Sequence, residues 1–268
     1  MSEKSPSQLR LRVFAGPNGS GKSTIIKKIR DTQVKEGVKL DVGIYINADD
    51  IAQNLKKGKF SFGPYEVNCS DPELADFAVS QGLLFGGFTK EELLRSFAIE
   101  GKKLKVLLMG NLDRLAQIIA RFLRHALIRA KKRFSFETVF SHKSNLDDMR
   151  LAAEAGYKVY LYFVSTESSE INKFRVALRV KEGGHDVPPE RIESRYYRSL
   201  DLLYDAAEIA YQSFFFDNSG NYEPYKVSGH FKVIGGVKEW DNIPDKDVAI
   251  WFTKYYLNKA KDKSDQQS

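Results

Sequence analysis

Cysteine and paired histidines are scarce in this chain. Cys69 is the single cysteine among 268 residues, which excludes an internal disulfide framework and any metal site built from several thiolates. The four histidines are scattered and show no paired spacing. Neither residue type therefore predicts a metal centre.

Long apolar runs are also missing. No stretch of about eighteen apolar residues occurs, the length that a membrane-spanning helix needs. The first ten residues, MSEKSPSQLR, contain no apolar signal segment. We therefore expect a cytoplasmic protein without a membrane-spanning part.

Signatures of two further protein classes are absent. The net charge of +7 is compatible with phosphorylated small molecules, an acidic protein or nucleic acid as the partner. No basic run interleaved with aromatic residues occurs, so we do not expect nucleic acid. An ATPase switch that drives a partner is disfavoured too, because the chain lacks an LSGGQ-like segment and a strand that ends in an Asp-Glu pair.

What the chain does contain is a complete phosphate-binding loop. Residues 16–23, GPNGSGKS, fit the pattern G-x-x-x-x-G-K-[ST], between an apolar stretch at 9–15 that predicts a strand and a stretch at 24–30 that predicts a helix. Its glycines let backbone N–H groups approach phosphate oxygens, Lys22 adds positive charge, and the Ser23 hydroxyl is suited to bind magnesium. We predict ATP and Mg²⁺ as ligands, with nucleotide contacts from Gly16, Pro17, Asn18, Gly19, Ser20, Gly21, Lys22, Ser23 and Thr24.

The rest of the chain alternates predicted strands and helices. Further strands are predicted at 42–46, 133–138, 157–164 and 213–216. The connections between them are too long for hairpins, which favours a parallel sheet. We expect an α/β fold of the P-loop NTPase class, with a five-stranded, mostly parallel sheet flanked by helices.

The expected domain organisation follows the same pattern. We predict a flexible N-terminus at 1–8, the P-loop domain at 9–225, a C-terminal hairpin and helix at 226–260, and a disordered tail at 261–268. Within the domain, residues from about 60 to 130 form a predicted helical insertion. The hairpin turn is expected at Ser228 and Gly229.

Acidic residues follow two of the predicted strands. Asp49 and Asp50 come after the strand at 42–46, and Glu137 and Thr138 end the strand at 133–138. Because ligands collect at the carboxyl ends of strands in open α/β sheets, Asp49 is our candidate for a general base that accepts the proton of an attacking hydroxyl. The alternative is that Asp49 or Asp50 caps the next helix.

Glu137 and Thr138 are our candidates for contact with the acceptor of a transferred group. Glu137 is also suited to contact the water shell of the magnesium ion. The alternative is a solvated glutamate at the end of a strand.

Arginines recur over residues 175–203. The glycines at 183–184 and the prolines at 188–189 separate two predicted helices. We predict a lid whose guanidinium groups reach a transferring phosphoryl group and offset its charge. The alternative is that the arginines form solvated helix faces. They are Arg175, Arg179, Arg191, Arg195 and Arg198.

In these motifs the chain resembles the zeta-toxin-like P-loop kinases, in the small branch often labelled predicted ABC-type ATPases. The similarity covers six segments in matching order. They are AGPNGSGKST at 15–24, INADDIA at 46–52, FSFETVFS at 134–141, AGYKVYLYFVS at 155–165, RVALRVKEGGHDVPPERIESRYYRSL at 175–200 and FDNSG at 216–220.

The resemblance implies ATP-dependent phosphorylation of a hydroxyl, which in the better-known members belongs to the sugar of UDP-N-acetylglucosamine. By motif, Lys22 and Ser23 match the nucleotide loop, Asp49 matches the proposed general base and Glu137 matches the acidic residue near the acceptor. The arginines that look like the γ-phosphate pair are Arg179 with Arg195 or Arg191. The resemblance also makes an antitoxin protein a candidate partner. The segment 60–130 and the tail beyond 225 depart from the family pattern, so the acceptor stays open.

Three functional hypotheses follow. The first is a kinase that phosphorylates a small molecule, with a nucleotide sugar as a candidate acceptor. The second is a polynucleotide kinase, which uses the same parts. The third is a nucleotide-dependent ATPase switch that acts on a protein or nucleic-acid partner.

Overall fold

The computed structural model describes residues 8–184, 186–220 and 225–266. The chain divides into two compact units. Unit 1 contains residues 1–42 and 137–268, and unit 2 contains residues 43–136. Most of the expected flexible N-terminus, His185 of the GGHDVP motif and the last two residues of the expected tail lie outside the described residues.

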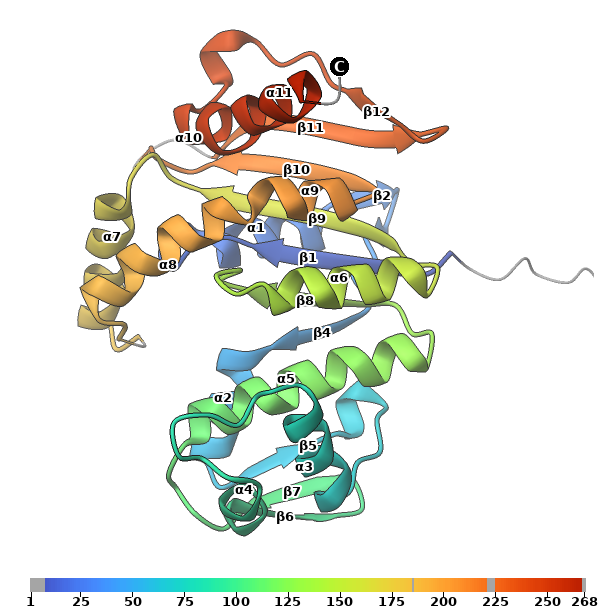
Figure 1. Ribbon diagram of the computed structural model, residues 1–268, viewed down its shortest axis with the longest axis vertical. Helices are drawn as coiled ribbons and strands as arrows, with labels where there is room; N and C mark the ends of the chain where they lie inside the picture. Colours follow the sequence, from blue (N-terminus) through green and yellow to red (C-terminus); the bar gives the residue numbers. More distant parts are fainter. Residues whose placement is uncertain (1–7, 185, 221–224, 267–268) are drawn as a thin grey trace, which may run out of the picture. The chain divides into compact units, whose positions relative to one another are not determined.

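Unit 1 is built on a mainly parallel sheet (Figure 1). β9 pairs in parallel with both β1 and β10, while β11 pairs antiparallel with β10 and with β12. The strands in order are β12 (Val237–Trp240), β11 (Lys226–Ile234), β10 (Gln212–Asp217), β9 (Lys158–Ser165) and β1 (Arg10–Ala15). Parallel strands covered on both faces read as near-continuous apolar runs, and this is why the sequence predicts β1 and β9 so clearly.

β8 (Phe134–Thr138) crosses the boundary between the units. Its last two residues, Glu137 and Thr138, belong to unit 1. There β8 follows β1 in the strand order. The ends of β8, β1, β9 and β10 therefore supply the residues that matter most for the site in unit 1.

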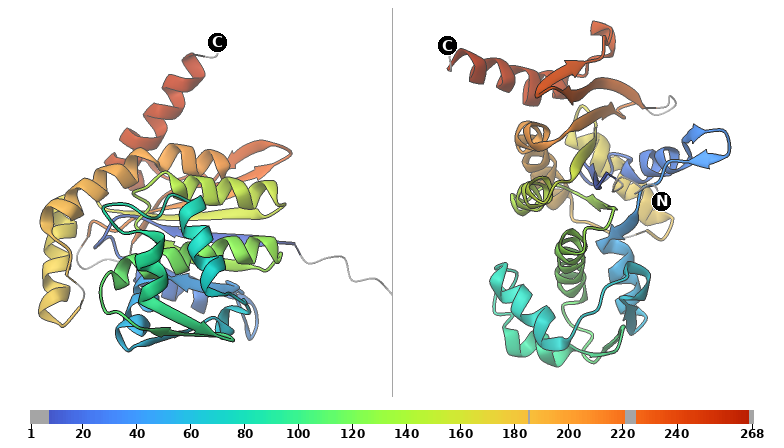
Figure 2. Two further views of the ribbon diagram at one scale, coloured as in Figure 1. Left: turned by 60° about the horizontal axis from the view of Figure 1, so that its bottom comes forward. Right: turned by 90° about the vertical axis from the view of Figure 1, so that its right-hand side faces the viewer.

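Helices cover both faces of the unit 1 sheet. α6 (Ser144–Glu154) and α9 (Leu203–Ile209) lie on one face, and α1 (Lys22–Asp31) lies on the other (Figure 2, right). α7 (Ser169–Lys181) and α8 (Pro189–Asp201) form a helical hairpin that leaves the end of β9. The sequence-based expectation of an α/β fold with a mainly parallel sheet is confirmed, but the sheet has seven strands in the described residues where five were expected.

Small elements complete unit 1. A short hairpin of β2 (Gln33–Lys35) and β3 (Val38–Lys39) follows α1. The chain ends in a series of helical elements that are mostly short. They are η2 (Asp245–Asp247), α10 (Ile250–Phe252), the π-helical η3 (Thr253–Leu257) and α11 (Asn258–Asp265).

Two expectations for the C-terminal part differ from the structure. β11 runs straight through Ser228 and Gly229, and the hairpin turn lies instead at Gly235 and Gly236, which adopt φ angles of 59° and 84°. Gly229 fits inside the strand because Phe252 packs against it. The expected disordered tail is helical up to Asp265.

Unit 2 contains a second, smaller sheet. β5 (Lys59–Ser61) and β6 (Phe97–Glu100) both pair antiparallel with β7 (Lys103–Val106). The segment at about 60–130, which we expected to be a helical insertion, therefore contains a three-stranded sheet as well as helices. These strands have three or four residues each and contain few consecutive apolar side chains, so a search for apolar runs misses them.

Helices and one strand of the main fold make up the rest of unit 2. β4 ends directly before α2, and α2 packs against α5. The elements are β4 (Ile44–Asn47), α2 (Ala48–Lys56), the 3-10 turn η1 (Gly63–Tyr65), α3 (Asp71–Ser80), α4 (Lys90–Ser96), α5 (Leu112–Arg129) and the first part of β8.

No helix in the part of the chain that the structure describes is long and apolar enough to cross a membrane.

Candidate nucleotide site

The phosphate-binding loop connects β1 to α1 in unit 1. Gly21 occupies the N-cap position of α1 in a left-handed conformation, with φ 91°, and makes no side-chain capping hydrogen bond. The first turn of α1 contains no acidic residue. The positive dipole end of the helix thus meets neither a side-chain cap nor a carboxylate of its own first turn, which favours a phosphate group there.

Lys22 lies inside this loop rather than in solvent. Its side chain is 8% exposed, and its Nζ donates hydrogen bonds to the carbonyl oxygens of Gly16 at 2.9 Å and Pro17 at 3.0 Å. Glu137 at the end of β8 lies on the other side, with Oε1 4.0 Å from Nζ. The ammonium is therefore held at the loop, where an incoming anion meets it.

Two asparagines that sequence analysis did not select hold the outside of the loop. Asn172 of α7 donates from Nδ2 to the carbonyl oxygen of Asn18 at 2.6 Å. Asn218, just after β10, donates from Nδ2 to the carbonyl oxygen of Ser20 at 2.8 Å. The only sequence signal for them was the position of Asn218 within the FDNSG segment.

The loop glycines make room for these asparagines. A Cβ atom on Gly19 would lie 2.6 Å from the carbonyl oxygen of Asn172, and one on Gly21 would lie 2.2 Å from Nδ2 of Asn218. Both glycines also have positive φ angles, 76° and 91°. Glycine is thus required here for space as well as for conformation.

Hydroxyl groups at the loop differ in exposure. Ser23 and Thr24, in the first turn of α1, are exposed. Ser20 is fully buried, and its Oγ has no hydrogen-bond partner among the residues that the structure describes. A buried polar atom without a partner is costly, so the cradle fits a ligand that offers hydrogen-bonding oxygens, as a nucleoside triphosphate does.

The Thr138 hydroxyl makes hydrogen bonds within the segment that follows β8. Its Oγ1 donates to Oδ1 of Asn145 at 3.2 Å and accepts from the backbone N–H of Phe140 at 3.0 Å. Phe140 is buried and has a φ angle of 59°, a rare conformation for a bulky residue. The threonine hydroxyl therefore maintains a strained loop, while the predicted contact of Glu137 and Thr138 with an acceptor stays a prediction.

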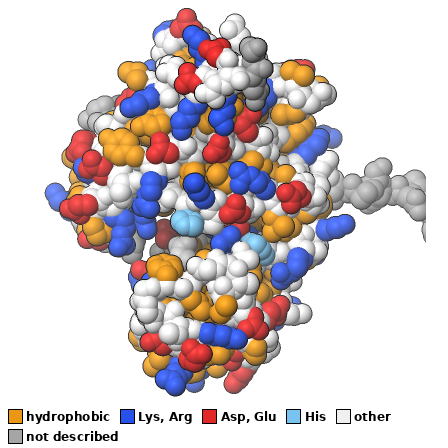
Figure 3. Space-filling view, viewed as in Figure 1, with side chains coloured by type: hydrophobic (Ala, Val, Ile, Leu, Met, Phe, Trp, Pro, Cys, Tyr) orange, Lys and Arg blue, Asp and Glu red, His pale blue; other side chains and the backbone are white. Residues whose placement is uncertain are grey.

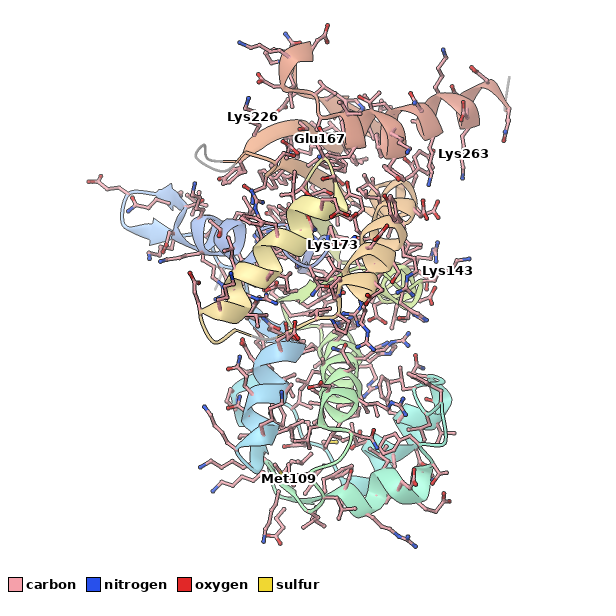
Figure 4. The ribbon with its side chains drawn as sticks, turned by 90° about the vertical axis from the view of Figure 1, so that its left-hand side faces the viewer. Met109, Lys143, Glu167, Lys173, Lys226 and Lys263 are labelled. Carbon is pink, nitrogen blue, oxygen red and sulfur yellow. The ribbon has the colours of Figure 1, made fainter. Side chains whose placement is uncertain are left out.

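The α7–α8 hairpin has its own small core and its own ionic contacts. Val176, Val187 and Ile192 pack together in it. Lys173 of α7 lies between the two helices (Figure 4), with Nζ 2.7 Å from Glu170 and 2.5 Å from Glu193 of α8. These contacts join the two helices, so the glycines at 183–184 do not separate them into independent parts.

The predicted arginines have different environments. Arg175 is half-buried and donates from Nη1 to the carbonyl oxygen of Asn218 at 2.6 Å and from Nη2 to that of Gly220 at 2.9 Å. Arg179, Arg191 and Arg198 are exposed, and Arg195 is half-buried. Figure 3 shows Lys and Arg side chains on the visible face of this hairpin. Arg175 therefore has a structural role, and the remaining four can serve a lid.

Asp49 and Asp50 belong to unit 2, in the first turn of α2. The N-cap of α2 is Asn47, whose side chain accepts a hydrogen bond from the N–H of Asp49 at 2.8 Å. The alternative that Asp49 or Asp50 caps this helix is therefore wrong. Both side chains are exposed, and a role for Asp49 as general base stays a prediction.

Comparisons with known proteins find one relative in sequence and several solved structures of similar fold. No model of a protein family matches the chain. An uncharacterized protein of Haemophilus influenzae (strain Rd) is 26% identical over 183 residues, which cover 68% of this chain and 89% of that protein. The crystal structure of AvrRxo1-ORF1:AvrRxo1-ORF2 with sulphate ions is similar with a TM-score of 0.50 and 17% identity, over 90% of this chain and 64% of that chain.

The same complex solved with ATP also gives a TM-score of 0.50, at 16% identity, over 90% of this chain and 64% of that chain. The chain therefore shares its fold with these AvrRxo1-ORF1:AvrRxo1-ORF2 chains. The chain spans slightly less than two thirds of the AvrRxo1-ORF1:ORF2 chains that it matches.

Proposed function

We propose that the protein is an ATP-dependent phosphotransferase that moves the γ-phosphate of ATP to a hydroxyl group of a small molecule. The observation that carries this proposal is the loop around Lys22. An uncapped helix N-terminus and a buried ammonium converge on one cradle there. The structural similarity to a complex solved with ATP supports the choice of nucleotide.

In this proposal each part of unit 1 has a task. The loop N–H groups and Lys22 hold the outer phosphates, and Ser23 holds the magnesium ion that accompanies ATP. Arg179 and Arg195, with Arg191, offset the charge of the loose transition state in which the phosphoryl group moves. Glu137 contacts the acceptor or the magnesium water shell.

We assign the general-base role to Asp49, from its place after β4 and from the family resemblance. The acceptor oxygen forms a bond to the γ-phosphorus as the bond from that phosphorus to the β,γ-bridging oxygen breaks. The hydroxyl proton passes to the Asp49 carboxylate, and ADP leaves. A nucleotide sugar such as UDP-N-acetylglucosamine is the first acceptor to test, because the resemblance suggests it.

The test is ATP turnover with and without a panel of nucleotide sugars, followed by mass spectrometry of a metabolite extract incubated with the protein, ATP and magnesium. We expect one acceptor to stimulate turnover and to gain the mass of one phosphoryl group. Hydrolysis that no acceptor stimulates would instead favour a nucleotide-dependent switch. Transfer to polynucleotide ends would favour a polynucleotide kinase.

An antitoxin is the protein partner that we propose to look for. The support is the sequence resemblance to the zeta-toxin-like kinases. Co-expression with the product of a neighbouring gene, followed by a growth assay, tests this part separately. Unimpaired growth without that product would contradict it.

A further inference from the structure

Hydrogen bonds from outside the phosphate loop control its shape. In loops of this kind the N–H groups point toward the anion, and two loop carbonyl oxygens, those of Asn18 and Ser20, accept bonds from Asn172 and Asn218. These partners are 154 and 198 residues away in sequence. The loop is thus clamped on both sides by elements that follow β9 and β10.

The turn that carries Asn218 is itself held at several points. The N–H of Asn218 donates to the carbonyl oxygen of Ser165 at the end of β9, at 2.8 Å. Its carbonyl oxygen accepts from Arg175 of α7 at 2.6 Å. The position of the Asn218 side-chain amide therefore depends on β9 and α7, and so does the position of the Ser20 carbonyl oxygen that it binds.

The C-terminal segment joins the same network. The indole N–H of Trp251, which is 2% exposed, donates to Oδ1 of Asp217 at 2.9 Å. Ser219 bridges the two strand ends, because its hydroxyl donates to Oδ1 of Asp217 at 2.7 Å and accepts from the N–H of Glu167 at 2.8 Å.

Glu167 completes the connection. Its Oε1 accepts the N–H of Ile250 at 2.9 Å. Figure 4 labels Glu167 beside the C-terminal segment. At the start of α10, Trp251 thus holds Asp217, directly before Asn218, and Ile250 holds Glu167, whose N–H bonds Ser219, directly after Asn218.

We propose that Asn218 is a positioning residue for the nucleotide phosphates, and that Trp251 acts on the phosphate loop through Asp217 and the Asn218 turn. The C-terminal segment, which has no counterpart in the motifs of the sequence resemblance, thereby becomes part of the nucleotide site. The inference rests on the proposed binding of ATP to this loop. It adds residues outside the phosphate-loop motif to that site.

The test is the dissociation constant of ATP with magnesium, measured by titration calorimetry on the full chain, together with the melting temperature without nucleotide. Asn218→Ala removes the donor to Ser20, and Trp251→Phe removes the donor to Asp217 while keeping a buried ring. Trp240→Phe is the matched control, since Trp240 of β12 is the other tryptophan of the chain and is 42% exposed.

We expect Asn218→Ala to raise the ATP dissociation constant about tenfold and Trp251→Phe about threefold, as the loss of single hydrogen bonds suggests. Trp240→Phe should change it less than about twofold. A purely structural role would lower the melting temperature and leave ATP affinity of the folded protein unchanged. Unchanged ATP affinity in Asn218→Ala overturns the inference. Unchanged ATP affinity in Trp251→Phe shows that the C-terminal segment is not part of the nucleotide site.

If Trp251→Phe does not fold, Asp217→Ala replaces it, because Asp217 is half-buried and accepts the hydrogen bond from the Trp251 indole. Unchanged affinity in that variant would equally exclude the C-terminal part. Wild-type protein that binds ATP but transfers nothing overturns only the proposed transferase activity. Wild-type protein that does not bind ATP overturns both.

Discussion

Single residues in this chain are constrained mostly around the phosphate loop. Lys22 is surrounded by the Gly16 and Pro17 carbonyl oxygens and by Glu137. An ammonium that is 8% exposed has lost most of its hydration, so its energy depends on what negatively charged or polar groups lie within reach.

Lys22→Met should weaken ATP binding by about 10- to 100-fold, because a hydrogen bond from a charged group to phosphate is worth roughly 1.5–3 kcal/mol. Titration calorimetry measures the effect. Lys27→Met is the matched control, since Lys27 is an exposed lysine of the same helix, and it should bind ATP like the wild type. Equal affinities for the Lys22 variant and the control would contradict the assignment.

Asp49→Asn should reduce phosphoryl transfer by about 10²- to 10⁴-fold, the range that general-base catalysis supplies, while ATP affinity stays within about twofold. Asp50→Asn is the neighbouring control, exposed on the same turn, and should retain most of the activity. Steady-state kinetics and calorimetry separate the two effects. Loss of ATP binding in the Asp49 variant would instead indicate that Asp49 binds the metal ion or stabilises the fold.

Cys69 provides a test of pH dependence in unit 2. Burial, with Glu73 and Asp71 nearby, raises the pKa of its thiol to about 12. In the unfolded chain the pKa returns to roughly 8.5. The folded state therefore keeps the thiol protonated, so the free energy of unfolding should fall as pH rises above roughly 8.5.

The thiolate is the species that alkylating reagents attack. At pH 8 iodoacetamide should modify native Cys69 more than about 100-fold more slowly than the denatured chain. Mass spectrometry of timed samples measures both rates. Similar rates in the two states would show that the thiol is accessible and that its pKa is close to the ordinary value.

Among the elements, the α7–α8 hairpin is the best candidate for a moving part. Its base is anchored, because Tyr196 donates from its hydroxyl to the carbonyl oxygen of Thr166 at 2.7 Å and Asn172 reaches the phosphate loop. Its own core and the contacts of Lys173 join the two helices. We therefore expect the hairpin to move as one body about its base, and not about the glycines at its tip.

Arg179→Ala and Arg195→Ala should each lower kcat by about 10²- to 10³-fold, with a smaller effect on ATP affinity, because their proposed charge stabilisation is needed only in the transition state. Arg198→Ala is the control. Arg198 is exposed on the same helix as Arg195 and bonds from Nε to the carbonyl oxygen of Ser194. Equal losses in all three variants would indicate a general effect of charge instead of specific roles.

At the scale of the whole molecule, an excess of basic residues could also serve a polyanion such as nucleic acid, whereas we propose a small molecule as the acceptor. The net charge is +7, and several of the basic side chains form contacts within the protein. Lys132 pairs with Glu66, Lys90 with Asp76, and Lys39 with Asp31. Such exposed pairs contribute little to stability, but they reduce the positive charge that is available for a polyanion.

We therefore expect no specific binding of single-stranded or double-stranded nucleic acid at physiological salt. Fluorescence anisotropy with labelled oligonucleotides at rising salt concentration is the measurement. Weak binding that vanishes between about 50 and 200 mM salt would be the ordinary effect of a basic protein. Submicromolar binding that survives 200 mM salt would favour the polynucleotide kinase hypothesis.

Local patterns explain what could be predicted. The glycine-rich loop and the apolar runs of β1 and β9 depend on residues close together in the sequence, and a short window contains the whole signal. The exposed strands of unit 2 have no such signal, and β11 kept its course through Ser228 and Gly229 because Phe252 fills the space beside the glycine. Pairing between strands decided the first case, and packing of Phe252 against Gly229 decided the second.

The sequence by itself determined that a strand, a phosphate loop and a helix follow one another, and that the sheet would be mainly parallel. Only the tertiary structure decided that Asn172 and Asn218 hold the loop, that Arg175 binds the Asn218 turn, and that Trp251 joins the network. The physical reason is that a side-chain amide or guanidinium binds whatever carbonyl oxygen folding brings within about 3 Å, and these partners lie far away in the chain. The residue type alone therefore does not identify these hydrogen-bond partners.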